Sequence, residues 1–201
     1  MIRAILDTCV LWPSRQRDFL LSLAIESTFE PLWSSSILDE LAYETRQKLQ
    51  RSGVTITQAE LDSAKLLAEM RRTFPEAECR YFDAAPPRRR LPDAGDDHVV
   101  EAAIAGSATH IVTNNLKDFP PDAMPDSLQI VTPSDFVTDI GLRDSNACWR
   151  ALEEMASRSG ERGPKQSPAE ILEGLARVYK WTALAEFLVT QLPDRIRRPI
   201  L

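Results

Sequence analysis

Four acidic residues fall where a parallel α/β sheet gathers its functional groups. Asp7 follows a short apolar run and Asp118 comes shortly after another, while Glu40 falls in the first turn of a predicted helix and Asp96 opens a helix rich in small residues. Open α/β sheets bind their ligands at the carboxyl ends of the strands. Hard divalent cations prefer oxygen ligands, and clustered carboxylates stay ionised together only beside a compensating charge. If the four side chains converge, they predict a magnesium or manganese site.

Each of these residues also has an ordinary structural explanation. Asp96 is a suitable helix N-cap, Glu40 is a favourable first-turn charge, and Asp118 is a common turn residue. Asp7 is the hardest to explain in this way, because it ends an apolar strand that should be buried. Convergence of the four in space is therefore what separates a site from chance.

The elements that must position these residues alternate along the first two thirds of the chain. Short apolar runs predict strands, and the segments between several of them carry apolar residues at helical spacing. The predicted strands are 2–6, 29–33, 79–82, 110–113 and 128–132. Strands that alternate with helices imply a parallel sheet flanked by helices, which is an α/β fold.

The character of the sequence changes after Gly141, where only helical patterns follow. Helices are expected over 146–158 and from Ser167 to about 192, and Ser167 with Glu170 forms a capping box at the start of the second. A similar pattern at Thr57 and Glu60 predicts a helix start in the first region. We therefore expect an α/β domain over 1–140 and a small all-helical domain over 141–201.

Composition limits the classes of partner and the compartment. The chain has 201 residues, and its 24 basic and 30 acidic side chains give a net charge of −6, the wrong sign for holding nucleic acid by bulk electrostatics. Three cysteines without a CxxC spacing argue against a disulfide scaffold and suit a reducing compartment. No apolar run reaches the roughly 20 residues of a membrane span, and the N-terminus lacks a signal-peptide pattern. We expect a cytoplasmic protein with no membrane partner.

Four ordered motifs resemble those of PIN domains. The first is Ile5–Leu11, an apolar strand followed by Asp7; the second is Ser36–Leu41, which contains Glu40. The third is Asp93–Ala103, where an aspartate opens an alanine-rich helix, and the fourth is Ile111–Phe119, with a strand, Thr-x-Asn and Asp-Phe. Together they cover residues 1 to about 137, and they are most similar to bacterial VapC-type toxins.

This resemblance implies a Mg²⁺- or Mn²⁺-dependent RNA endonuclease, commonly a homodimer, that a small VapB-like antitoxin inhibits. It implies that Asp7, Asp96 and Asp118 coordinate the metal and that Glu40 coordinates it or orients the attacking water. Supporting groups and phosphate contacts are expected from a further set of residues: Thr113, Asn115, Asp97, Arg88, Arg89 and Arg90. Either Asp96 or Asp97 suits the third metal-ligand position, and helical phase favours Asp96. The three arginines equally suit a solubilising loop.

Three other functions compete with this interpretation. A haloacid-dehalogenase-type phosphotransferase needs a second aspartate two residues after the first, where this chain has Cys9. A phospho-accepting receiver domain needs an acidic pair after the first strand, and Asp7 has no acidic neighbour. A non-catalytic PIN-like module that binds RNA or protein is the remaining alternative, although all four acidic positions are filled.

Overall fold

The computed structural model describes residues 1–79, 91–160 and 163–191. They form two compact units, the first made of residues 1–13 and 30–131 and the second of residues 14–29 and 132–201. The predicted division at 140/141 differs from these units in two places. The segment 14–29 belongs with the C-terminal helices, and the boundary between the α/β and helical parts falls at 131/132.

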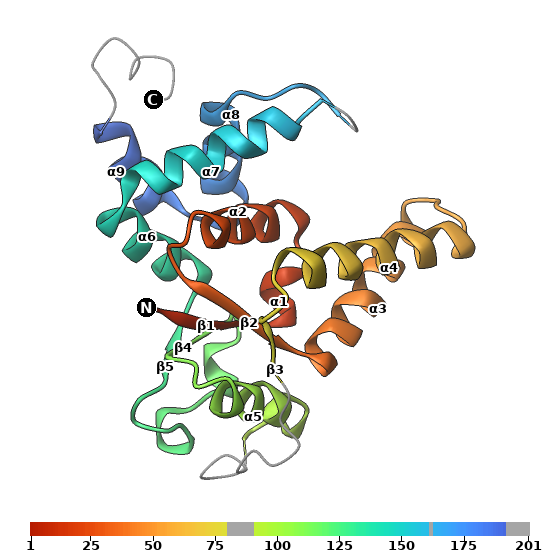
Figure 1. Cartoon of the computed structure of the whole chain (residues 1–201), viewed down its shortest axis with the longest axis vertical. Helices are drawn as coiled ribbons and strands as arrows, with labels where there is room; N and C mark the ends of the chain where they lie inside the picture. Colours follow the sequence, from red (N-terminus) through yellow and green to blue (C-terminus); the bar gives the residue numbers. More distant parts are fainter. Residues whose placement is uncertain (80–90, 161–162, 192–201) are drawn as a thin grey trace. The chain divides into compact units, whose positions relative to one another are not determined.

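The first unit contains a five-stranded parallel sheet in the order β3-β2-β1-β4-β5 (Figure 1). Its strands are β1 (Arg3–Leu6), β2 (Glu30–Ser34), β3 (Glu78–Cys79), β4 (His110–Val112) and β5 (Gln129–Val131). The central strand is β1, where Ile5 pairs with Leu32 on one side and Ile111 on the other. All three side chains are buried, as expected for apolar strands covered on both faces.

Helices flank this sheet, which confirms the predicted α/β fold class. They are α1 (Thr8–Leu11), α3 (Ser35–Arg51), α4 (Ile56–Thr73) and α5 (Asp97–Ala105). Helix α5 packs against β1, β2 and β4, while α3 packs against β2, α1 and α4. The hydroxyl of Ser34 accepts a hydrogen bond from Ile37 N and caps α3, as the run of serines predicts.

Two local predictions in this unit are wrong. Helix α4 begins two residues earlier than expected, because the Thr55 hydroxyl accepts from Gln58 N, 3.3 Å away, and leaves Thr57 inside the helix. Thr55 and Gln58 satisfy the same capping pattern as Thr57 and Glu60. Glu40 lies beyond the first turn of α3, since that helix already begins at Ser35.

The second unit has helices and no strand among its described residues. It comprises α2 (Ser14–Ile25), α6 (Pro133–Arg143), α7 (Ser145–Arg158), α8 (Pro168–Tyr179) and α9 (Thr182–Thr190). Helix α2 packs against α7 and α8, and α6 packs against α7 and α9. The ring of Phe19 in α2 lies 5.6 Å from that of Trp181, and both side chains are fully buried. This contact is one reason why an N-terminal helix joins the C-terminal unit.

The predicted helix from Ser167 to about 192 is two helices. The capping box of Ser167 and Glu170 is present, but the chain turns at Lys180, whose φ of 64° is left-handed. Ile171, Leu175 and Leu184 are buried as predicted, whereas Val178 is exposed near the end of α8. Within the described residues, no helix is both long enough and apolar enough to cross a membrane.

Candidate metal centre

The carboxyl end of the central strand positions Asp7. Leu6 pairs with Val112, and Asp7 N donates to the carbonyl of Val112 at 3.2 Å, so the next residues of both strands lie side by side. The Asp7 carboxylate is buried and its Oδ2 accepts from Thr113 Oγ1 at 2.6 Å. It also accepts from Cys9 Sγ at 3.0 Å. Two donors on one oxygen hold this carboxylate in a single orientation.

Cys9 is a part of this arrangement that the sequence reasoning missed. Burial first, and then the negative charge of Asp7, raise the pKa of the Cys9 thiol to about 12. The thiol therefore stays protonated at neutral pH and keeps its donor function. The backbone N–H of Asn114 donates to Cys9 Sγ at 3.2 Å. The available signal was the position of Cys9 two residues after the strand-ending aspartate.

Thr113 links Asp7 to the loop that follows β4. Its side chain is fully buried, and its hydroxyl accepts from Asn115 N at 3.0 Å while donating to Asp7. The predicted supporting residue Asn115 thus enters the network through its backbone, and its side chain is exposed. The loop continues through a 3₁₀ turn, Leu116–Asp118, to the buried Phe119.

Glu40 is held from a different side. Its Oε2 accepts from Thr8 Oγ1 at 2.6 Å, and its Oε1 lies 3.6 Å from His98 Nε2. His98 Nδ1 lies 2.7 Å from the carbonyl of Gly95, which fixes the ring at the start of α5. About half of the Glu40 side chain is exposed. Thr8 and His98 are further neighbours of the predicted site that the sequence did not indicate.

The charges of several other acidic residues act on Asp96. Burial raises its pKa most, followed by the charges of Asp7, Asp118 and Asp93, and His98 lowers it; the result is a pKa of about 6. Asp7 and Asp118 therefore both lie close enough to Asp96 to disfavour its ionised form. Asp96 makes no side-chain capping hydrogen bond, so the N-cap explanation of this residue does not hold. Asp93 caps the preceding turn instead, accepting from Gly95 N at 2.8 Å.

Asp97 is half-buried, and its Oδ1 has no hydrogen-bond partner among the described residues. The electrostatic link of Asp96 to Asp7 and Asp118 agrees with the helical-phase argument that favours Asp96 over Asp97. Arg88, Arg89 and Arg90 lie outside the described residues, and their predicted contact with RNA phosphates stays a prediction.

The donor set fits a hard divalent cation. Carboxylate oxygens are the preferred ligands of Mg²⁺ and Mn²⁺, and a cation would relieve the repulsion that raises the pKa of Asp96. In the described part of the chain, no three His, Cys, Asp or Glu side chains are gathered as tightly as a bound metal requires. The assignment of Asp7, Glu40, Asp96 and Asp118 as catalytic metal ligands thus stays a prediction.

Comparison with known protein families gives a match to the PIN domain. The sequence profile described as PIN domain matches residues 3–117, which is more than half of the chain. This range contains Asp7, Glu40 and Asp96 and ends one residue before Asp118. Comparisons with curated proteins and with solved structures found no significant match.

Proposed function

Because the chain belongs to the PIN domain family, whose members are typically nucleases that use divalent ions, we propose that it is a metal-dependent endoribonuclease. The observation that carries this proposal is the raised pKa of Asp96, caused in part by Asp7 and Asp118. Asp96 is thus close to carboxylates from two other segments, one of which follows the central strand. Ionising a half-buried carboxylate beside other carboxylates lowers the stability of the folded protein, and a bound cation would offset this loss.

We assign the cation, Mg²⁺ or Mn²⁺, to Asp7, Asp96 and Asp118. When bound, such an ion lowers the pKa of a coordinated water and offsets charge on the scissile phosphate. Glu40 would complete the ligand set or accept a hydrogen bond from the attacking water. Its exposed carboxylate on α3 suits either role.

The other residues of the site keep these carboxylates in place. Thr113 and Cys9 donate to the same oxygen of Asp7, so they orient its carboxylate. Thr8 does the same for Glu40. Asn115 stabilises Thr113 through its backbone N–H, and Asp97 adds negative charge at the start of α5. Such supporting hydrogen bonds commonly decide how well a metal ligand performs.

The finer biological assignment is a toxin of a VapBC-like pair. It rests on the resemblance of the four motifs to VapC-type toxins, which also supports an RNA substrate, a VapB-like antitoxin, a homodimer and a cytoplasmic location. The net charge of −6 favours RNA binding through the cation and a local basic segment rather than through the whole surface. Arg88–Arg90 is the basic segment that we propose for this role.

Cleavage of single-stranded RNA by the full chain tests the proposal. We expect cleavage in Mg²⁺ or Mn²⁺, its loss in a chelator, and its loss in Asp7→Asn. Asp39→Asn is the matched control, because Asp39 is an exposed carboxylate on α3. Cleavage that survives chelation contradicts the metal. RNA binding without cleavage would favour the non-catalytic module, and a stable aspartyl-phosphate would favour the phosphotransferase.

A further inference from the structure

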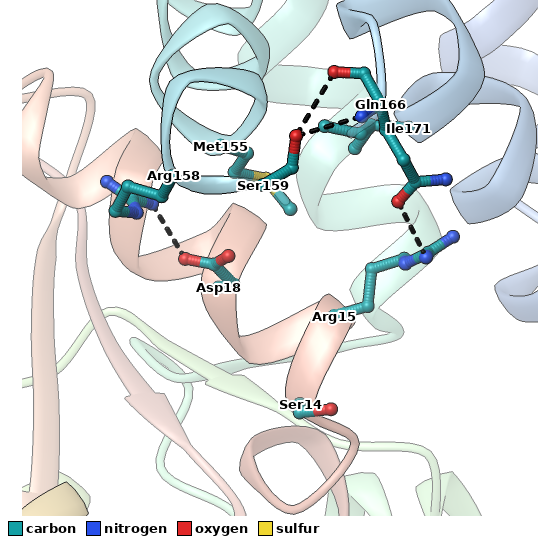
Figure 2. Close-up of a pocket in the computed structure, with 8 residues that line it drawn as sticks. All are labelled: Ser14, Arg15, Asp18, Met155, Arg158, Ser159, Gln166 and Ile171. Carbon is teal, nitrogen blue, oxygen red and sulfur yellow. Dashed lines mark hydrogen bonds and ion pairs between the residues drawn. The ribbon is translucent and has the colours of Figure 1, made fainter. Parts of the chain in front are cut away.

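A polar cavity of about 220 Å³ lies within the helical unit, among α2, α7 and the start of α8 (Figure 2). Met155 and Ile171 supply apolar surface. The polar lining consists of Ser14, Arg15, Asp18, Arg158, Ser159 and Gln166. None of these residues takes part in the proposed metal centre, and the whole cavity belongs to one compact unit.

The two arginines of the cavity have different partners. Arg158 pairs with Asp18 at 2.8 Å and with Glu154 at 2.8 Å, so its charge is offset. Arg15 Nη2 instead donates to the neutral amide oxygen of Gln166 at 3.0 Å. Figure 2 shows the Arg158–Asp18 pair and the Arg15–Gln166 pair on opposite sides of the cavity. Within the described chain no acidic side chain pairs with Arg15, so its side of the cavity keeps an uncompensated positive charge.

Helix α8 has a glycine where the Arg15 guanidinium lies. A Cβ atom at Gly174 would overlap Arg15 Nη1. Gly174 is buried in the interior of α8, a position where glycine is a poor helix former. The missing side chain thus makes room for the charged group, which is half-buried beside the cavity rather than extended into solvent.

We propose that this cavity binds a phosphate group. The planar donor fork of arginine matches two phosphate oxygens, and the hydroxyl of Ser14, which also lines the cavity, can donate to another. Ser14 is also the first residue of α2, where the helix dipole favours an anion. Met155 and Ile171 suit the carbon atoms attached to the phosphate.

The volume of the cavity limits the size of the group that it can bind. Pockets that enclose a whole drug-sized ligand measure roughly 300–1,000 Å³, so this cavity suits a phosphate group and its nearest atoms. Such a group occurs at the end of an RNA chain and on small phosphorylated metabolites. The inference does not rest on the proposed nuclease site. Chelator in the assay removes divalent ions, so phosphate binding through a metal ion at that site does not contribute to the measured binding.

The test is equilibrium binding to the full chain in the presence of chelator. The probes are inorganic phosphate, ribose 5-phosphate, and a short oligoribonucleotide with either a 5′-phosphate or a 5′-hydroxyl end. We expect saturable binding of the phosphate probes at millimolar concentration or below. A preference for the 5′-phosphorylated over the 5′-hydroxyl oligonucleotide identifies an RNA end as the source. Tighter binding of ribose 5-phosphate than of inorganic phosphate, without that preference, identifies a small phosphorylated compound.

Three variants connect this binding to the cavity. Arg15→Gln should raise the dissociation constant about tenfold or more, because it removes the charged donor fork. Gly174→Ala should weaken binding by displacing that fork, and Arg15→Lys, which keeps the charge, should fall between Arg15→Gln and the wild type. Arg177→Gln, at an exposed arginine of α8, is the charge-matched control and should bind normally. Circular dichroism confirms folding. Absence of saturable phosphate binding, or equal affinity in Arg15→Gln and the wild type, would overturn the proposal.

Discussion

Replacing Asp96 by asparagine should stabilise the cation-free protein at neutral pH, although it removes a proposed metal ligand. The folded protein raises the pKa of this carboxyl group from 3.8 to about 6, first through burial and then through Asp7 and Asp118. A carboxyl group with a raised folded-state pKa opposes folding once it ionises. That cost is absent below about pH 4, grows as the pH rises, and is complete above about pH 6. Asparagine has a similar shape and never ionises.

The magnitude follows from the two pKa values. Their difference corresponds to about 3 kcal/mol as an upper bound. Asp96 is only half-buried, so solvent screening reduces this to roughly 1 to 2 kcal/mol. A bound cation should reverse the order of the two proteins. Ligand at 100 times its dissociation constant stabilises the folded state by about 2.7 kcal/mol, and Asp96→Asn should lose most of that gain.

The assay is urea unfolding of the wild type and Asp96→Asn between pH 4 and pH 8, with chelator and with Mg²⁺. The exposed carboxylate Asp39 provides the control, since Asp39→Asn should change the free energy of unfolding by less than about 0.5 kcal/mol. A difference between the wild type and Asp96→Asn that does not vary with pH would refute the electrostatic argument. So would an Asp96→Asn protein that is less stable than the wild type at pH 8 in chelator.

Three other predictions follow from particular contacts. Cys9→Ala should lower RNA cleavage about tenfold, because Asp7 Oδ2 loses one donor, and Cys9→Ser should restore most of it; equal rates in Cys9→Ala and the wild type would contradict this role. Trp181→Ala should lower the free energy of unfolding by about 3–5 kcal/mol, since the ring is fully buried against Phe19; a loss below 1 kcal/mol would contradict that packing. Lys180→Gly should raise the free energy of unfolding by about 1 kcal/mol, because Lys180 has a left-handed backbone that glycine adopts without strain. Thermal unfolding measures this gain, and a melting temperature below that of the wild type would contradict the prediction.

Much of the fold could be predicted from local sequence. Apolar runs such as Ile2–Leu6 mark strands because parallel strands are buried on both faces. The start of α3 follows from Ser34, and the start of α8 from Ser167 and Glu170. The grouping of α2 with the C-terminal helices could not be predicted in this way. It depends on contacts such as Phe19 with Trp181, which join residues far apart in the chain.

The break at Lys180 has a similar cause. The apolar spacing continues through it, so periodicity predicts one helix from Ser167 onward. The chain leaves the helix there because Lys180 adopts a left-handed conformation and Trp181 is buried. Lysine gives no local signal for such a turn, which glycine usually occupies.

The places of Asp7 and Asp96 in the fold could be predicted, but the contacts around the acidic residues could not. Strand ends and helix starts mark Asp7 and Asp96, because parallel strands bring their carboxyl ends to one edge. The role of Cys9 depends on the pairing of β1 with β4, which places its thiol beside Asp7 and the backbone of Asn114. The contact of Glu40 with Thr8 likewise depends on how α3 packs against α1.

The most direct test of the central claim is a crystal structure of the full chain with Mn²⁺, in which anomalous scattering locates the ion. We predict an ion bonded to carboxylate oxygens of Asp7 and Asp96, with Asp118 coordinating it directly or through water. The same peak should be absent from Asp7→Asn crystals grown with Mn²⁺. Mn²⁺ bound elsewhere in a protein that still cleaves RNA only with added metal would contradict the account.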